Sequence, residues 1–263
     1  MIAALRPPSP EPQPCKICAA PAPLFGVVDF SRSCEVSRGI EFPLVGIPVY
    51  YRRCGACGFL FTDGFDDWTE ADFRQHIYNA DYITVDPDYA ENRPAGFAQL
   101  VTQLFGANRG ALRILDYGGG NGKTAELLRS VGFCAVETYD PFTPRYAQPP
   151  DSAFDLVTCF ETLEHLPDPL GGIADIVARL AQPGLVLFST FTQPQDFHLQ
   201  KMNWWYIGPR NGHISIFTRL ALTFAWRRQD FFFGSINENC HIAFRELPDF
   251  AKHLVQFQAS PAH

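Results

Sequence analysis

A glycine-rich turn between an apolar stretch and an amphipathic stretch constrains the fold of this chain more than any other feature. Residues 111–115 are mostly apolar and predict a short buried strand, and Asp116 follows them. Four glycines fall within residues 118–122, and glycine is used where the backbone takes a positive φ or a ligand approaches closely. Apolar residues at helical spacing then predict a helix over residues 123–131. A strand, a glycine turn and a helix N-terminus together indicate a nucleotide site in an α/β fold.

The spacing of the turn distinguishes three kinds of nucleotide site. A phosphate-binding loop requires Gly-x-x-x-x-Gly-Lys-Ser/Thr, but its first glycine would fall on Tyr117 and Asp116 would face the phosphates. The dinucleotide pattern Gly-x-Gly-x-x-Gly/Ala can be fitted from Gly120 onwards. The pattern Asp-x-Gly-x-Gly-x-Gly is met in full by Asp116, Gly118, Gly120 and Gly122. A carboxylate in this place suits a cationic ligand better than a diphosphate.

Two further acidic signals follow along the chain. Residues 133–139 predict a second strand, and Asp140 at its end can accept hydrogen bonds from both hydroxyls of a ribose. Residues 154–160 predict a third strand, which leads into Glu161 and then into Glu-His-Leu-Pro-Asp-Pro at residues 164–169. Ligands bind beyond the carboxyl ends of strands in open α/β sheets, so Glu161 is a candidate binding residue.

These motifs resemble those of the class I S-adenosylmethionine-dependent methyltransferases, over about residues 75–245. The glycine turn resembles their first motif, and Glu-His-Leu-x-Asp-Pro resembles a signature of small-molecule methyltransferases. The resemblance implies a Rossmann-like sheet whose glycine turn lies under the methionine part of S-adenosylmethionine, with Asp116 acting on its amino group. The predicted cofactor residues on this side are Asp116, Tyr117, Gly118, Gly120, Gly122, Asp140 and Glu161. A Rossmann-like domain with another ligand is the alternative.

The chain departs from the family between Asp140 and Phe154. Prolines at 141, 144, 149 and 150 leave no room for the usual third strand and its helix, because proline removes the donors of a strand ladder. The adenine pocket that this part normally builds must therefore be simplified. No adenine ligand is predicted, although Phe142 is a candidate wall.

Two Cys-x-x-Cys pairs precede this region and predict a structural zinc site, because two short loops can bring four thiolates to one tetrahedral ion. The four predicted ligands are Cys15, Cys18, Cys54 and Cys57. The intervening stretch is longer than the ~15–20 residues of a compact ribbon, and its alternating apolar residues predict hairpin strands. A closed four-thiolate site has no open position and is assigned no catalysis. Free core cysteines and a redox dithiol are the alternatives.

The domain organisation follows from these motifs. Residues 1–14 are proline-rich and predict a disordered or extended tail. Residues 15–66 predict a zinc-ribbon-like β module, and residues 67–263 predict the S-adenosylmethionine-binding domain. This layout resembles small-molecule methyltransferases with an N-terminal zinc-binding domain, among them sugar C-methyltransferases. Tyr78 and Tyr82 lie in an aromatic segment and are candidate cofactor residues, through phenol hydroxyls or cation–π contact with a sulfonium. The alternative is that these aromatic residues pack a helix onto the core.

The stretch of residues 191–215 is irregular, aromatic and interrupted by glycine, which predicts a functional loop on the acceptor side. Similar methyltransferases carry a Gly-His here, matched by Gly212 and His213. His213 is the candidate catalytic residue, because an imidazole can take a proton from the acceptor as the methyl group arrives. The alternative role is to fix the loop against the sheet.

Composition limits the partners and the location. The formal net charge of −7 disfavours a nucleic-acid surface, and no apolar run is long enough to cross a membrane. Without a secretory signal, eight cysteines indicate a cytoplasmic protein with reduced thiols. We expect methyl transfer to a small molecule, with a sugar or nucleotide-linked sugar as a candidate acceptor. The alternatives are a zinc-ribbon RNA methyltransferase or RNA-binding protein, and a non-catalytic S-adenosylmethionine-binding protein.

Overall fold

The computed structural model describes residues 9 and 11–256, which form two compact units. The first unit contains the described residues up to Asp88 together with Thr162–Ile173 and Thr190–Ala225. The second unit contains Tyr89–Glu161, Ala174–Ser189 and the described residues from Trp226 onwards. Each unit is therefore assembled from several stretches of the chain.

The predicted domains map onto these units unequally. The described residues of the predicted zinc module, 15–66, lie wholly in the first unit, whereas the predicted domain of residues 67–263 contributes to both. Of the predicted disordered or extended tail, residues 1–8 and 10 lie outside the described part. Gln13 and Pro14 form strand β1, so these two residues take the extended form of that prediction.

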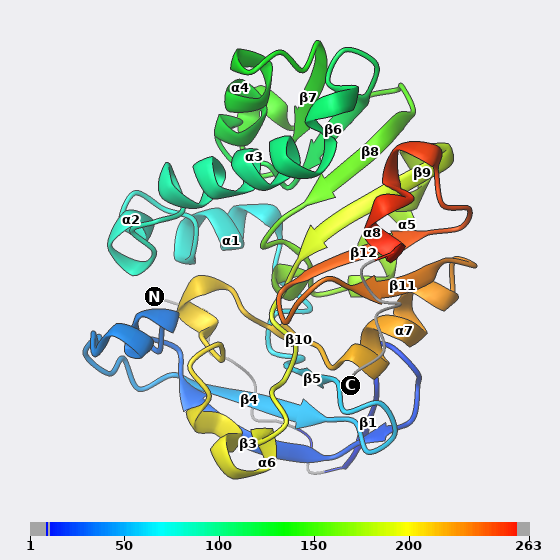
Figure 1. Cartoon of the computed structure of the whole chain (residues 1–263). Coiled ribbons are helices and arrows are strands. Elements are labelled where there is room, and N and C mark those ends of the chain that lie inside the picture. The colour runs from blue at the N-terminus through cyan, green and yellow to red at the C-terminus, as the bar shows by residue number, and fades with distance from the viewer. Residues whose placement is uncertain (1–8, 10, 257–263) are drawn as a thin grey trace. The chain divides into compact units, whose positions relative to one another are not determined.

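A six-stranded sheet is the centre of the second unit (Figure 1). Its strands are, in spatial order, β11 (Phe232–Ser235), β12 (Cys240–Phe244), β9 (Leu180–Ser189), β8 (Phe154–Cys159), β6 (Arg113–Tyr117) and β7 (Ala135–Tyr139). Strands β7, β6, β8 and β9 are parallel, and β12 pairs antiparallel with both β9 and β11. A mostly parallel sheet built from alternating strands and helices confirms the predicted α/β class.

The register of the parallel strands determines which side chains meet at their carboxyl ends. Asp116 of β6 lies opposite Thr138 of β7 on one side and Thr158 of β8 on the other. The sequence placed Asp116 just after its strand, but the strand runs two residues further and includes it. Strand β6 lies between two parallel neighbours, and Asp116 is 2% exposed.

One face of this sheet is covered by helices α3 (Asn92–Phe105) and α4 (Lys123–Ser130), which Figure 1 shows side by side. Val101 and Phe105 of α3 and Leu128 of α4 are fully buried against Ile114 of β6. Burial of large apolar side chains is the main stabilising contribution to such a layer, at roughly 1.5–3 kcal/mol each. Helix α8 (His253–Gln256) follows the last strand and adds Leu254 to the same core.

The segment between β7 and β8 contains one 3₁₀ turn, Pro144–Tyr146, and no strand. The prediction that the prolines leave no room for a third strand and helix is thus confirmed. Strand β7 is consequently an edge strand of the sheet. The short segment keeps Tyr146 close to the glycine turn, since the Asp140 backbone N–H donates to the Tyr146 carbonyl over 3.0 Å.

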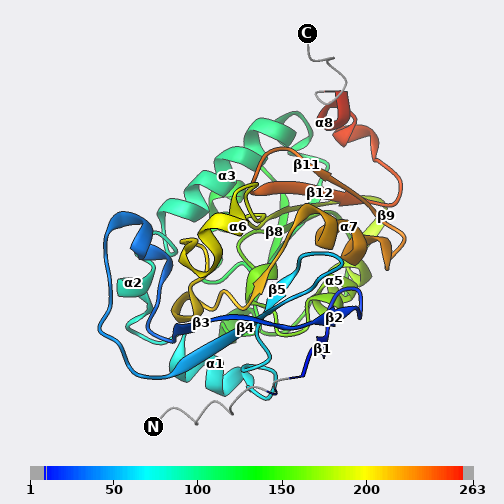
Figure 2. The ribbon, with the colours of Figure 1, turned by 90° about the horizontal axis from the view of Figure 1, so that it is seen from below.

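The first unit contains a four-stranded antiparallel sheet, in which Figure 2 shows β3 and β4 side by side. Its strands are, in spatial order, β10 (Ser215–Ile216), β5 (Leu60–Phe61), β4 (Pro48–Arg53) and β3 (Leu24–Asp29). Strands β1 (Gln13–Pro14) and β2 (Pro21–Ala22) form a separate pair. The hairpin strands predicted between the two cysteine pairs are therefore confirmed.

Short helices complete the first unit. They are α1 (Glu70–His76), α2 (Tyr82–Val85) and α6 (Phe197–Gln200). Helix α1 begins at a capping box, in which Thr69 and Asp72 exchange hydrogen bonds. The boundary between the units falls within α5 (Pro169–Ala178) and α7 (Arg219–Arg227). No described helix combines the length and the apolar character that a bilayer crossing requires.

Candidate functional site

The glycine turn after β6 has a backbone that explains its spacing. Gly118, Gly120 and Gly122 have φ angles of +71°, +55° and +80°, which other residues rarely adopt. The N–H groups of Gly118 and Gly119 donate to the Tyr139 carbonyl at the end of β7, over 2.8 and 3.2 Å. The alternating glycines of the motif are therefore the three left-handed positions of one tight turn.

Gly119 is required for a different reason. A Cβ atom built there would lie 2.5 Å from Asp116 Oδ2 and 2.8 Å from a Thr138 methyl carbon. The missing side chain lets the turn pass directly over the Asp116 carboxyl. Gly119 lies inside the motif but at a position for which the motif specifies no residue.

The Asp116 carboxyl is buried in an environment that opposes its negative charge. One oxygen, Oδ1, accepts a hydrogen bond from Thr158 Oγ1 over 3.0 Å, while Oδ2 is buried and has no hydrogen-bond partner among the described residues. Burial, with a smaller contribution from the charge of Asp140, raises the pKa of Asp116 to about 7. A cationic group placed beside Oδ2 would donate a hydrogen bond to this oxygen and would stabilise the buried negative charge.

Asp140 follows β7 and is also buried, with 8% exposure. Its carboxylate oxygens accept hydrogen bonds from the Gly120 N–H over 3.0 Å and from the Phe142 N–H over 2.8 Å. Burial raises the pKa of Asp140, while these hydrogen bonds act against the rise. Each oxygen of a carboxylate can accept a further hydrogen bond, so a ribose diol fits this group.

Tyr146 covers the last glycine of the turn. A Cβ at Gly122 would lie 2.6 Å from the Tyr146 hydroxyl oxygen and 2.8 Å from two of its ring carbons. No sequence pattern predicted this contact, because Tyr146 lies beside the turn only as a result of the short segment that follows Asp140.

Glu161 follows β8 with a φ of +47°, an unusual value for a residue with a side chain. Its backbone N–H donates to Ser189 Oγ over 2.8 Å, and Ser189 Oγ donates to Glu161 Oε1 over 2.7 Å. Ser189, at the end of β9, therefore fixes Glu161 at the carboxyl edge of the sheet. Strained backbone of this kind is concentrated at functional sites.

Tyr117, the remaining predicted cofactor residue of this unit, uses its hydroxyl within the fold. That hydroxyl donates to Asp175 Oδ2 over 2.8 Å, and burial raises the pKa of the phenol. The ring of Tyr117 packs near that of Tyr139, with 5.2 Å between ring centroids. A direct role of the Tyr117 side chain in cofactor binding stays a prediction.

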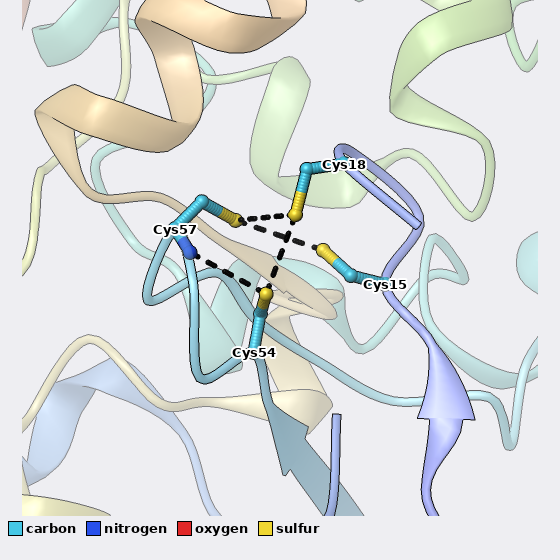
Figure 3. Close-up of side chains that lie close together, drawn as sticks. All are labelled: Cys15, Cys18, Cys54 and Cys57. Atoms are coloured by element: carbon cyan, nitrogen blue, oxygen red, sulfur yellow. Dashed lines mark hydrogen bonds between the residues drawn. The ribbon is translucent and has the colours of Figure 1, made fainter. Parts of the chain in front are cut away.

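The four predicted zinc ligands converge in the first unit (Figure 3). Sulfur–sulfur distances are 3.6 Å for Cys15–Cys57, 3.4 Å for Cys18–Cys54 and 3.6 Å for Cys18–Cys57. Four thiolates at about 2.3 Å from one tetrahedral zinc ion would be separated by about 3.8 Å, close to these values. The hydrogen bond with Cys57 lowers the pKa of Cys15 and raises that of Cys57. The cluster thus fits zinc in ligand type and in spacing.

The two cysteine loops have the same local geometry. In each, the residue after the second cysteine has a positive φ, +62° at Ala19 and +73° at Gly58. Its N–H donates to the carbonyl of the first cysteine, over 2.9 Å to Cys15 and 3.0 Å to Cys54. Backbone N–H groups also point at the sulfurs, among them Ile17 N at 3.4 Å from Cys15 Sγ. Such N–H groups stabilise thiolates, which is the form that binds metal.

A second polar cluster in the first unit contains His213, the predicted catalytic residue. Glu164, His165 and His213 each offer a ligand-type atom, and these atoms lie within 4.8 Å of one another. The Tyr206 hydroxyl donates to Glu164 Oε1 over 2.5 Å, and the Tyr206 carbonyl lies 2.8 Å from His213 Nδ1. The sequence placed His213 in a loop but did not predict this grouping with Tyr206.

His213 is 5% exposed, and its tautomer is determined by its neighbour. A backbone carbonyl only accepts hydrogen bonds, so the contact with Tyr206 places the proton of the neutral ring on Nδ1. The lone pair is then on Nε2, as both proton removal and metal binding require.

Tyr78 and Tyr82, the other predicted cofactor residues, belong to the first unit. The Tyr82 hydroxyl donates to the Asn211 carbonyl over 3.2 Å, and the ring of Tyr82 is 7% exposed. The Tyr78 ring lies 5.3 Å from that of Tyr82 and 6.1 Å from that of His165, between centroids. The two tyrosines therefore pack beside the Glu164–His165–His213 cluster, and their role in cofactor binding stays a prediction.

Comparison with known proteins places the chain among methyltransferases. A family model described as a methyltransferase domain matches residues 89–232, more than half of the chain. A stretch of 56 residues is 46% identical to a ubiquinone biosynthesis O-methyltransferase of Pseudoalteromonas translucida (strain TAC 125), covering 21% of this chain and 23% of that protein. The chain thus matches less than a quarter of that relative's length.

Solved structures that are similar to this chain at low sequence identity include the following two. The pyocyanin biosynthetic protein PhzM matches with a TM-score of 0.49 and 14% identity, over 70% of this chain and 64% of that one. CalS10, described as an amino pentose methyltransferase from Micromonospora echinaspora involved in calicheamicin biosynthesis, matches with a TM-score of 0.45 and 15% identity. That match covers 66% of this chain and 100% of CalS10.

Proposed function

Because the chain belongs to the methyltransferase family and is an S-adenosylmethionine-dependent enzyme, we propose that it transfers the methyl group to a small-molecule acceptor, with the cofactor held between Asp116 and Asp140. The observation that supports this placement most strongly is the buried Asp116 carboxyl. Its Oδ2 atom lies under a glycine turn and has no hydrogen-bond partner among the described residues. The amino group of the cofactor is positively charged and could donate a hydrogen bond to this oxygen.

Each group of the turn has a distinct proposed task. Asp116 binds the ammonium group, and Asp140 accepts hydrogen bonds from the two ribose hydroxyls. The four glycines of residues 118–122 let the cofactor approach the backbone, because they have no Cβ atoms. Glu161, fixed by Ser189, is proposed to border the cofactor at the end of β8. When bound, S-adenosylmethionine supplies an electrophilic methyl group on a sulfonium sulfur. The protein's main contribution is then alignment of the reactants and exclusion of water.

The proposed acceptor is a small molecule. One relative described above is named a ubiquinone biosynthesis O-methyltransferase, and CalS10 is described as an amino pentose methyltransferase. A sugar or nucleotide-linked sugar is accordingly the proposed acceptor class. We assign proton removal from the acceptor to His213, because its Nε2 carries the lone pair and its Nδ1 is held by Tyr206.

The four-cysteine cluster is proposed to hold a structural zinc ion. Cys15, Cys18, Cys54 and Cys57 occupy all four positions of a tetrahedral ion, which leaves none for a substrate. Its role would be to join the β1–β2 region to the loop between β4 and β5. Binding of RNA is the alternative for this module, but a net charge of −7 argues against it. A cytoplasmic location is proposed because none of the eight cysteines forms a disulfide bond in the described part of the chain.

Calorimetric titration with S-adenosylhomocysteine tests the placement of the cofactor. The wild-type chain should bind one equivalent, and Asp140→Ala should abolish measurable binding, since the ribose loses its two acceptors. Asp151→Ala is a matched control, because Asp151 is exposed in the same unit. Unchanged affinity in Asp140→Ala, with both variants folded by circular dichroism, would remove the ribose assignment.

A further inference from the structure

The Glu164–His165–His213 cluster has the composition of a metal site that is separate from the four cysteines. Its three ligand-type atoms, one carboxylate oxygen and two imidazole nitrogens, lie within 4.8 Å of one another. Glu164 is fully buried and His213 is 5% exposed, unlike the acidic groups that gather on a hydrated surface. Two histidines with one carboxylate suit divalent transition metals such as Zn²⁺, Fe²⁺ and Co²⁺.

Hydrogen bonds from neighbouring residues hold the side chains of the cluster in place, as is usual for metal ligands in proteins. A ligating histidine usually donates its other ring N–H to a backbone carbonyl or a carboxylate, and a ligating carboxylate is itself hydrogen-bonded. Tyr206 supplies both contacts here: its carbonyl accepts from His213 Nδ1 over 2.8 Å, and its hydroxyl donates to Glu164 Oε1 over 2.5 Å. One residue therefore fixes the tautomer of the histidine and the orientation of the carboxyl.

The backbone that carries the cluster is tied together before any ion binds. The Ile214 N–H donates to the Glu164 carbonyl over 2.9 Å, and Ser215 Oγ donates to the Leu166 carbonyl over 2.7 Å. Gly212 has a φ of +93°, and a Cβ there would lie 2.8 Å from His165 Nδ1. The glycine thus lets the ring of His165 lie against the loop that carries His213. A site with a prearranged backbone loses less conformational entropy on binding.

We propose that Glu164, His165 and His213 bind a divalent transition-metal ion through three protein ligands. Three ligands leave at least one coordination position open, as in catalytic rather than structural zinc sites. An ion here would coordinate a hydroxyl or water and lower its pKa.

Binding of the metal ion does not depend on the proposed function, but its effect on the acceptor does. An ion would use the same lone pair of His213 that we assign to proton removal. The acceptor hydroxyl would then lose its proton because it is coordinated, and the proton would pass to solvent. Without an ion, the imidazole takes the proton directly. Both routes require His213, so a metal-binding measurement, not activity, distinguishes them.

Titration of the full chain with Co²⁺ tests the proposal. The protein is first dialysed against a weak chelator that leaves zinc in the cysteine cluster, and its zinc content is confirmed by mass spectrometry. One further equivalent of Co²⁺ should bind and give weak d–d absorption bands without an intense thiolate-to-cobalt band. Glu164→Gln and His213→Gln should weaken this binding by at least about 100-fold, because each removes a ligand.

The controls separate a ligand role from a general loss of folding. His198→Ala removes an exposed histidine of the same unit and should leave Co²⁺ binding unchanged. Tyr206→Phe keeps all three ligands but loses the hydroxyl that orients Glu164, and should weaken binding by about 10- to 100-fold. All variants are compared by circular dichroism and by affinity for S-adenosylhomocysteine.

The proposal is overturned if the wild-type chain binds no second ion, or if Glu164→Gln and His213→Gln, both folded, bind Co²⁺ as tightly as the wild type does. A thiolate-to-cobalt band with release of zinc would show that the ion has entered the cysteine cluster instead. If S-adenosylhomocysteine still binds in these cases, the proposed function stands and only the second metal site fails.

Discussion

Asp116 is the residue in which burial and charge conflict most clearly. The residue is 2% exposed, and burial raises the pKa of its carboxyl to about 7, although Thr158 donates a hydrogen bond to one of the carboxyl oxygens. Near neutral pH the isolated protein therefore carries this group partly protonated. A cation bound beside it would favour the ionised form, so cofactor binding and proton release are linked.

This linkage predicts how cofactor affinity depends on pH. Below pH 7, binding of S-adenosylhomocysteine must expel the proton of Asp116, so affinity should rise with pH by up to about tenfold per unit and then level off. Titration calorimetry between pH 5.5 and about 8 measures the slope, and Asp116→Asn should lose most of it together with much of the affinity. A flat profile in the wild type would contradict the role of Asp116.

The same pKa has the opposite effect on the stability of the cofactor-free protein. The folded value of about 7 lies above the usual 3.8, so the folded state binds this proton more tightly than the unfolded state. The contribution of Asp116 to the unfolding free energy should therefore decline as pH rises from about 4 to about 7. Comparison of urea unfolding in the wild type and Asp116→Asn isolates this contribution.

His213 should separate catalysis from cofactor binding. We expect His213→Ala to lower turnover by roughly 10²- to 10⁴-fold, because the acceptor's proton loses its route. The affinity for S-adenosylhomocysteine should stay within about twofold. Steady-state kinetics with an identified acceptor, beside calorimetry, measures both. Full activity in the variant would show that His213 only fixes its loop through Tyr206 and Tyr51.

The glycine turn combines positive φ angles at three glycines with a close approach of the backbone to Asp116 at Gly119. A substitution at Gly119 tests the close approach alone. Gly119→Ala keeps an ordinary backbone but brings a methyl group to 2.5 Å from Asp116 Oδ2. We expect cofactor affinity to fall at least about tenfold, roughly 1.4 kcal/mol. Gly110→Ala is the control, since no atom lies within 4 Å of its added Cβ. Equal affinities by calorimetry would show that the turn does not need this close approach.

If the two cysteine loops hold a structural zinc ion, the free energy of unfolding should depend on zinc. Cys54→Ser should lose the tightly bound zinc and several kcal/mol of unfolding free energy, because binding energy of a structural zinc site is folding energy. Cys134→Ser, which changes an exposed cysteine, should stay within about 0.5 kcal/mol of the wild type. Zinc content and thermal unfolding of both variants provide the test. Undiminished zinc in Cys54→Ser would exclude the proposed site.

Elements defined by local pattern were predictable from the sequence. The predicted strands 133–139 and 154–160 correspond to β7 and β8, and the predicted helix 123–131 corresponds to α4. Left-handed glycines and Cys-x-x-Cys loops are also local requirements, so their spacing was visible in the chain. Tyr146 over Gly122 and Tyr206 beside Glu164 depend on contacts that only the fold creates.

Each of the two units contains several separate stretches of the chain, and no sequence motif predicted this division. Strand β10, at residues 215–216, pairs with β5 at residues 60–61, more than 150 residues earlier. Residues of the predicted zinc module thus complete a sheet with residues of the predicted methyltransferase domain. Sequence boundaries follow the order of the chain, whereas the units follow contacts in space.

This arrangement predicts that the chain cannot be divided after residue 66. A truncated chain of residues 67–263 lacks β3, β4 and β5 and leaves β10 without its partner strand. We expect it to aggregate or to unfold at a markedly lower temperature than the full chain, because an open strand edge and exposed apolar residues remain. A soluble fragment with a sharp thermal transition and full affinity for S-adenosylhomocysteine would contradict this expectation.

The cationic nature of the ligand at Asp116 is tested most directly by competitive titration of the full chain with S-adenosylhomocysteine and NAD. We predict one equivalent of S-adenosylhomocysteine bound at neutral pH, with binding lost in Asp140→Ala and no measurable binding of NAD. Binding of NAD, or a site that accepts neither nucleotide, would contradict the placement of the cofactor between Asp116 and Asp140.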